Sequence, residues 1–202
     1  FEHLLYHYRL AYSRWSYMLV VYGGESFTAL SSGLQDALWR LGGVPFEHRS
    51  DSLTAAYKNL SNADQEDFTK RYGALCQHYN MSATRNNRGK GHENGSVEAA
   101  HGHLKSRLHQ MLELRGSYDF VSVVRYQQFI NHVVATHNKR HHKLITLEKA
   151  HLQALPAYRT HDFDELTVRV STTSTMFVKR VMYTVPSRLI GSLLRVHLYD
   201  DR

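Results

Sequence analysis

The spacing of the apolar residues changes at Pro156. Before Pro156, long segments place apolar side chains at every third or fourth residue, which is typical of helices that bury one face. After it, Leu166, Val168 and Val170 alternate with polar residues, and two later segments alternate in the same way, which is typical of strands. This change predicts an α/β domain followed by a small β module in one chain.

The beginning of the chain combines a hairpin with a helix. Leu4–Ala11 and Trp15–Tyr22 are rich in Tyr, Leu and Val and are joined by a short turn, which predicts two paired strands. The many aromatic side chains of this hairpin could stack on bases, but core packing of the sheet is the better explanation of them. Ser26 is a good N-cap residue, apolar residues recur at helical spacing from Phe27 to Leu41, and glycines follow, so a helix is expected there.

The other expected elements are two short strands and four helices. The strands are Val44–His48 and Asn80–Thr84, and the helices begin near Asn62, Asn94, Val121 and Leu147 and extend to about Cys76, Leu114, Thr136 and Leu155. In the third of these helices, Val124, Phe129, Ile130 and Val133 are the core candidates. We therefore expect a domain over residues 1–138, a helical connector over 139–160 and a small β-barrel module over 161–202, which could be cut short at its end.

Positive charge is concentrated in the middle of the chain. The net charge is +7 and the pI about 9.5, and the excess of Lys and Arg lies between Arg85 and Arg159. Such a localised excess favours a partner with many negative charges, such as nucleic acid.

The single cysteine and the short apolar runs limit the class of protein. Cys76 cannot form an internal disulfide or a cysteine zinc site, and it is expected in the core. No apolar run approaches the length of a membrane span, so we expect no membrane crossing. The single cysteine favours a reducing compartment, so we expect a cytoplasmic location. His137 and His141 have the spacing of a metal pair on a helix, but Lys139 and Arg140 beside them disfavour a bound cation.

Two carboxylates stand out by their position. Asp51 comes just after a predicted strand, and Glu98 lies one turn into a helix that follows the basic segment Arg85–Gly91. Carboxylates are the ligands that Mg²⁺ prefers, and a pair of such ions can act on a phosphodiester. A carboxylate after a strand more often serves in a turn or cap, and one near a helix start more often complements the helix dipole, so the residues alone give only a weak signal for a metal site.

The chain resembles a known family over nearly its whole length. The similar stretches occur in this order: Leu10–Trp15, Gly42–Pro45, Arg49–Leu53, Lys90–Glu98, Asn138–His142, Glu148, Leu155–Pro156, Tyr183–Pro186 and Leu189–Gly191. They are similar to the catalytic core of the insertion-sequence transposases called IstA, members of the retroviral-integrase superfamily. Lys90–Glu98 resembles the Lys-Gly-x-Val-Glu region of that family, with a few extra residues here.

The resemblance implies an RNase H-like mixed sheet flanked by helices and a DDE active site. Asp51 matches the second acid and Glu98 the third, and together with a first aspartate they would bind two Mg²⁺ (or Mn²⁺) ions. The first aspartate is expected on a strand before Leu4, outside this sequence, so the chain alone should be inactive. The implied reactions are cleavage at a transposon 3′ end and transfer of that end to target DNA.

The basic side chains are then expected to contact DNA phosphates. The candidates are Arg85, Arg88, Lys90, Lys105, Lys139, Arg140 and Lys143. The resemblance also implies transposon ends and target DNA as substrates, a homo-oligomer on DNA, an AAA+ helper ATPase, and a place at the bacterial nucleoid.

Two other functions remain open on the sequence. One is an RNase H-like module that binds DNA or aids assembly without a working site. The other is an RNase H-type nuclease that hydrolyses RNA–DNA hybrids. An aspartate on an apolar strand upstream of Phe1 would favour the transposase, whereas a nuclease would need no transposon ends.

Overall fold

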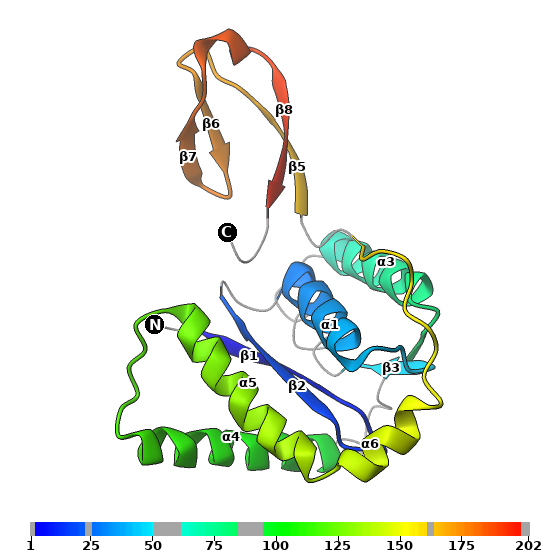
Figure 1. Cartoon of the computed structure of the whole chain (residues 1–202). Helices are drawn as coiled ribbons and strands as arrows, with labels where there is room; N and C mark the ends of the chain where they lie inside the picture. Colours follow the sequence, from blue (N-terminus) through cyan, green and yellow to red (C-terminus); the bar gives the residue numbers. More distant parts are fainter. Residues whose placement is uncertain (1–2, 23–25, 51–61, 85–94, 161–163, 199–202) are drawn as a thin grey trace. The chain divides into compact units, whose positions relative to one another are not determined.

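The structure is a computed structural model of the chain, and it forms two compact units. It describes residues 3–22, 26–50, 62–84, 95–160 and 164–198. The units are Phe1–Thr160 and His161–Arg202, and each is considered by itself. Helices and strands mix throughout the first unit, as expected (Figure 1).

The first unit begins with the predicted hairpin. β1 (Leu4–Arg9) pairs antiparallel with β2 (Ser16–Val21). The turn is closed by a hydrogen bond from Leu10 N to Trp15 O (2.9 Å). Arg14 takes a positive φ of 63° within it, which lets the chain reverse direction in a few residues.

Side chains of a helix occupy the outer edge of β2. The amide of Asn138 bonds Ser16 N and Ser16 O (2.9 Å each), and that of Gln127 bonds Val20 N (2.8 Å) and Met18 O (2.9 Å). These amides provide the donors and acceptors that a further strand would provide. The hairpin can therefore gain another strand only beside β1.

One face of the hairpin is covered by α1 (Phe27–Leu41) and α3 (Asn62–His78). Ser26 caps α1 by accepting a hydrogen bond from Ala29 N (3.0 Å), and Gly42 ends it in the left-handed conformation (φ 82°), as the sequence predicted. The core between these elements includes Leu34 and Leu38 of α1, Tyr8 of β1 and the predicted Cys76.

The second sheet consists of β3 (Glu47–Arg49) and β4 (Ser82–Thr84), which are parallel. The expected strand at Val44–His48 is partly wrong. Val44 instead exchanges two backbone hydrogen bonds with Gln153 (2.9 and 2.8 Å). Pro45 has no N–H to donate, and the pairing with β4 begins only after it.

The other face of the hairpin is covered by α4 (Gly95–Arg115) and α5 (Val123–Lys139) (Figure 1). Met18 and Val20 of β2 pack there against a group of apolar helix residues, namely Leu104, Leu108, Ile130, Val133 and Val134. The prediction of Val124 as a core residue is wrong, because 64% of its surface is exposed. Ser122 caps α5 by accepting from Arg125 N (3.3 Å), so Val124 lies in the first, exposed turn.

The connector helix lies earlier in the chain than expected. α6 spans His142–Lys149, whereas the sequence predicted Leu147–Leu155. Beyond α6 the chain runs alongside Val44, where Gln153 pairs with it and Leu152 and Leu155 pack on the first core. This non-local pairing overrides the tendency of the segment to form a helix, which its apolar spacing indicated.

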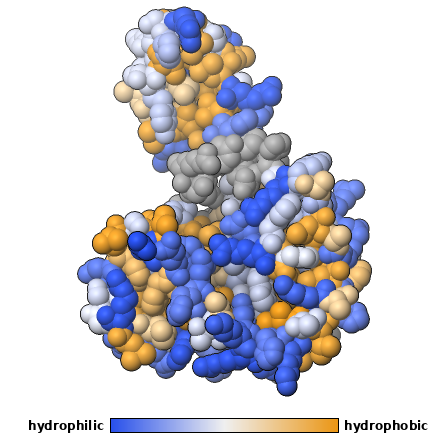
Figure 2. Space-filling model, viewed as in Figure 1, coloured by the Kyte–Doolittle hydropathy of each residue, from blue (hydrophilic) through white to orange (hydrophobic). Residues whose placement is uncertain are grey.

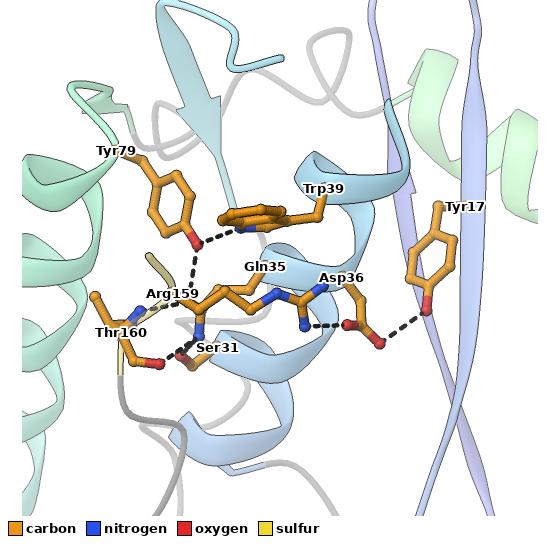
Figure 3. Close-up of polar contacts among 8 residues, drawn as sticks. All are labelled: Tyr17, Ser31, Gln35, Asp36, Trp39, Tyr79, Arg159 and Thr160. Carbon is orange, nitrogen blue, oxygen red and sulfur yellow. Dashed lines mark hydrogen bonds and ion pairs between the residues drawn. The ribbon is translucent and has the colours of Figure 1, made fainter. Parts of the chain in front are cut away.

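A buried amide joins the end of the first unit to α1. Gln35 has no exposed surface. Its Oε1 accepts hydrogen bonds from Tyr79 OH and Thr160 N (2.8 Å each), and its Nε2 donates to Ser31 Oγ (3.2 Å) and Thr160 O (3.3 Å) (Figure 3). All the hydrogen-bonding groups of this amide are used, which fixes Thr160 against the helix.

Charged and aromatic contacts continue this network along α1 (Figure 3). Asp36 binds the guanidinium of Arg159 (2.6 Å) and accepts from Tyr17 OH (3.3 Å). The Arg159 guanidinium also lies 5.4 Å from the centre of the Trp39 ring. Two consecutive residues, Arg159 and Thr160, are thus anchored to one helix.

The described part of the second unit, residues 164–198, contains four strands in two antiparallel pairs. β5 (Asp164–Arg169) pairs with β8 (Leu193–Leu198), and β6 (Thr175–Val178) pairs with β7 (Val181–Thr184). A 3-10 turn at Ser187–Leu189 precedes β8. The alternation of apolar residues correctly predicted strands here, but within residues 164–198 the two pairs do not close a barrel.

The surface of the second unit carries many apolar residues (Figure 2). Phe177, Met182 and Leu193 are each at least 59% exposed. Among the helices described in either unit, none is long and apolar enough to cross a membrane.

Candidate functional site

The two predicted acids belong to segments that follow β3 and begin α4. Asp51 lies outside the described residues, two positions after β3 ends at Arg49. Glu98 lies in the first turns of α4, where the structure describes the backbone. The distance between their carboxyl groups therefore stays a prediction, but the described residues around them can be located.

The parallel pairing of β3 and β4 defines one edge of this region. Arg49 pairs with Thr84, so both strands end at the same edge of the small sheet. The chain leaves β3 toward Asp51 and leaves β4 toward the basic segment that contains Arg85, Arg88 and Lys90, which also lie outside the described residues. An acid and three cations therefore belong to segments that start side by side.

Strand β1 contacts both β3 and α4. The ring of Tyr8 stacks on His48 of β3, with centroids 6.0 Å apart and planes within 7°. On the opposite face, the ring of His7 lies 4.5 Å from that of His101 of α4. His48 comes three residues before Asp51, and His101 three residues after Glu98. Adjacent residues of one strand thus hold the two segments that carry the predicted acids.

The imidazoles of His48 in β3 and His7 in β1 are both held in the neutral form. Burial lowers the pKa of His48 to about 4, and its Nδ1 lies 2.6 Å from Tyr72 OH. Burial, followed by the charges of His101 and Arg9, lowers the pKa of His7 to about 3. Near neutral pH these imidazoles therefore act as packed polar rings and not as cations.

Burial of His48 makes the fold sensitive to acid. Its pKa is about 4 in the fold against an ordinary value of 6.5, so the unfolded chain binds this proton more readily. The contribution of His48 to the free energy of unfolding should be fully present above its ordinary pKa. It should be lost as the pH falls toward the pKa that His48 has in the folded state. We expect His48 to account for a loss of about 2 kcal/mol between about pH 7 and about pH 5.

Urea denaturation of the chain at the two pH values measures this loss. In His48→Gln the pH dependence should shrink by that amount, whereas His132→Gln, at an exposed position of α5, should behave like the wild type. An unchanged pH dependence in His48→Gln would contradict the burial of a neutral imidazole.

The predicted DNA-contacting residues that the structure describes lie in two places. Lys105 is exposed on α4, and Lys139, Arg140 and Lys143 are exposed where α5 ends and α6 begins. The start of α4 and this junction lie at the same end of the unit (Figure 1). The charges of His101 of α4 and His137 of α5 both lower the pKa of His7, which agrees with this placement.

Residues of the α5–α6 junction also form hydrogen bonds with the hairpin turn. Asn138 bonds the backbone of Ser16, and the Glu148 carboxylate accepts a hydrogen bond from Ser13 N (2.9 Å). This contact brings Arg14 of the turn and Arg9 of β1 close to the junction. The sequence indicated only a strand and a turn for them, since no local pattern could predict a contact over more than a hundred residues.

The histidine pairs do not form a metal centre in the described part of the chain. The rings of His137 and His141 have centroids 5.1 Å apart, so the predicted proximity of this pair is confirmed. Within the residues that the structure describes, no group of three or more His, Cys, Asp or Glu side chains is arranged to hold a metal ion.

Comparison with known proteins gives two informative similarities. The chain is 52% identical over 201 residues to an uncharacterized protein of Sinorhizobium fredii. It is 25% identical over 199 residues to a transposase of Aminobacter aminovorans. These matches cover 100% and 97% of this chain but 40% and 39% of the relatives, so the chain spans about two fifths of their length. No protein-family model matches the chain.

Proposed function

We propose that the chain is the core of a DDE transposase of the IstA type. It would cleave DNA at the 3′ ends of a mobile element and join those ends to target DNA. The similarity to a transposase over 97% of the chain supports the general function, and the ordered IstA-like motifs support the type. The contact of β1 with both acid-bearing segments is the structural observation that carries the proposal.

The element order supports an RNase H-like fold for the first unit. A hairpin, a helix, a strand, a helix, a parallel strand and a further helix follow one another. The amides of Asn138 and Gln127 occupy the edge of β2, which leaves the side of β1 for the strand that would carry the first acid. The two strand pairs of the second unit would belong to the proposed barrel.

The donor atoms proposed for the site suit a hard divalent cation. Asp51 and Glu98 would hold Mg²⁺ or Mn²⁺ through carboxylate oxygens. When bound, two such ions supply Lewis acidity and neutralise charge at a phosphodiester. The chain's own part would be to hold the acids through the contacts of β1 and to position DNA with its cations.

The proposed partners follow from the same reaction. Transposon ends and target DNA would be the substrates, and several copies would assemble on paired ends with an AAA+ helper ATPase. In a bacterial cell, this work would take place at the nucleoid.

The reaction itself tests the proposal. Full-length protein is incubated with DNA carrying the ends of its element, target DNA and Mg²⁺, and the products are separated by size. Joined products that disappear when the metal is chelated support a transposase. Cleavage of RNA–DNA hybrids without joining would instead favour a nuclease, and DNA binding without either reaction would favour a non-catalytic module.

Binding to DNA should depend strongly on salt. Lys105, Lys139, Arg140 and Lys143 would contact phosphates, and each contact releases counterions. With about four contacts, a fourfold rise in salt should weaken binding by about 10²-fold. Fluorescence anisotropy with labelled duplex DNA measures the slope.

Single variants show how much each residue contributes to that slope. Lys105→Gln, Lys139→Gln and Lys143→Gln should each lower it by about one. Lys149→Gln, at the exposed end of α6, is the control and should leave it unchanged. If the slope is equally small in the wild type and in all the variants, these residues do not contact DNA phosphates.

A further inference from the structure

Five basic residues lie around the place where the hairpin turn contacts the α5–α6 junction, and we call them the junction cluster. They are Arg9, Arg14, His137, Arg140 and His141. The imidazoles of the two histidines have centroids 5.1 Å apart. Burial is the main cause that lowers the pKa of both imidazoles. The charges of Arg14, Arg9 and Arg140 lower the pKa of His141 further, and those of His141, Arg9 and Arg140 lower that of His137. Three guanidinium groups thus act on His141 and two of them on His137.

The backbone holds the cluster together. Asn138, between His137 and Lys139, bonds both Ser16 N and Ser16 O at 2.9 Å. His137 itself forms a hydrogen bond with the backbone of Arg14. Arg14 lies at the positive-φ position of the turn. The position of its Cα beside the junction is therefore set by contacts that do not involve its guanidinium.

The surroundings of the cluster are mainly basic. The charges of Arg9 and His137 of the cluster and of His101 of α4 all act on His7 of β1, and Lys139, His142 and Lys143 flank the cluster along α5 and α6. Among the residues whose side chains the structure describes, the acid at this junction is Glu148 of α6, whose carboxylate accepts a hydrogen bond from Ser13 N.

The helix that starts at the cluster adds to its positive potential. α6 is capped by His141 without a side-chain hydrogen bond. The first N–H groups of a helix favour a negative charge. The last carbonyls of α5, which ends at Lys139, act in the opposite direction, so an anion is favoured here mainly by the side chains.

We propose that the junction cluster binds a phosphodiester group of the DNA backbone, and that His137 and His141 take up protons as it does so. This inference rests on the proposed function, because it assumes that DNA is the substrate. Arginine stays protonated at every relevant pH, so in the absence of DNA the cluster limits repulsion by keeping its histidines neutral. A phosphate bound among the guanidinium groups adds a negative charge next to the imidazoles. This attraction outweighs the repulsion by the guanidinium groups and favours the imidazolium forms.

Proton uptake makes binding depend on pH with a definite sign. The complex holds more protons than the separate molecules, so DNA should bind more tightly as the pH falls. The effect should appear between about pH 8 and about pH 6, where histidines titrate. Basic residues that stay charged throughout this range cannot produce it.

Anisotropy measurements on the full-length protein test the inference. Duplex DNA is titrated at about pH 6 and about pH 8 with equal ionic strength. Wild-type affinity should rise about 5-fold or more at the lower pH, and His141→Gln should lose about half of that gain on a logarithmic scale. Arg14→Gln and Arg140→Gln should each weaken binding about 5- to 10-fold and lower the salt slope by about one.

Two control variants identify the origin of these losses. Arg125→Gln changes an exposed arginine at the opposite end of α5 and should bind like the wild type. Arg140→Lys keeps the charge at the junction and should recover most of the affinity, which excludes misfolding as the cause. If Arg14→Gln and Arg140→Gln bind like Arg125→Gln, or if wild-type affinity does not change with pH, the inference is overturned.

A competition arm identifies the source of the phosphate. Inorganic phosphate at constant ionic strength should compete only slightly if the cluster recognises DNA backbone. Competition strong enough to remove the difference between wild type and Arg140→Gln would assign the cluster to free phosphate and overturn the DNA assignment.

The outcome is separable from that of the proposed function. Strand transfer retained by Asp51→Asn, with weaker DNA binding by Arg14→Gln, would reject the catalytic proposal and leave the cluster standing. Loss of transfer in Asp51→Asn, with unchanged binding by Arg14→Gln and the full pH dependence kept by His141→Gln, would reject the cluster and leave the catalytic proposal standing.

Discussion

Full-length protein carrying Asp51→Asn or Glu98→Gln should lose strand transfer by about 10³-fold or more. In the proposed site each carboxylate holds a divalent ion, and an amide is a much poorer ligand for such an ion. Metal stabilisation of the transition state is worth several kcal/mol, and each 1.36 kcal/mol changes the rate about tenfold. Quantifying joined DNA products over time measures the loss.

DNA binding by these variants should stay intact, because the proposed phosphate contacts are made by other side chains. Glu113→Gln provides a matched control on α4: its carboxylate is exposed and pairs with His109 (3.2 Å), so transfer should continue at the wild-type rate. Strand transfer retained in Asp51→Asn or in Glu98→Gln would falsify the assignment of the acids.

Replacing Gln35 by leucine should lower the free energy of unfolding of the chain by about 4 kcal/mol. The side chain is fully buried and makes four hydrogen bonds, to Tyr79, Ser31 and both backbone groups of Thr160. Leucine would leave several of these partners buried without a hydrogen bond, and each such group costs about 1–3 kcal/mol. Urea denaturation followed by circular dichroism measures the change.

Gln110→Leu is the matched control for this prediction. Gln110 is exposed on α4, so the same chemical change there should alter stability by less than about 0.5 kcal/mol. Equal stability of the two variants would show that the network at Gln35 contributes little to the fold.

Much of the fold was predictable because its signals are local. Ser26 and Gly42 mark the two ends of α1, and the apolar residues between them repeat at helical spacing. The tyrosine- and valine-rich hairpin and the alternating segments after Pro156 were equally clear. Caps, turns and periodicity act within a few residues, so they can be read from the sequence alone.

The errors have non-local causes. Residues near Gln153 have helical spacing but pair with Val44, more than a hundred positions away. Val124 is apolar, yet the cap at Ser122 places it in an exposed first turn. Tertiary contacts override propensity in the first case, and the exact start of a helix sets the buried face in the second.

The candidate site was predictable in its chemistry but not in its arrangement. Residue types and resemblance indicated Asp51 and Glu98, and both remain predictions because the structure does not describe their side chains. The contacts of His7 and Tyr8, which hold the neighbouring segments, have no signature in the sequence. The same is true of Arg14, whose place near His141 depends on a helix far along the chain.

The amide side chains along β2 also limit how copies of this chain can join. An open strand edge is a template for strands of other molecules and a frequent start of aggregation. Asn138 and Gln127 already occupy the outward backbone groups of Ser16, Met18 and Val20. A sheet that runs continuously from one copy into the next cannot form at this edge, so contacts between copies have to use other surfaces.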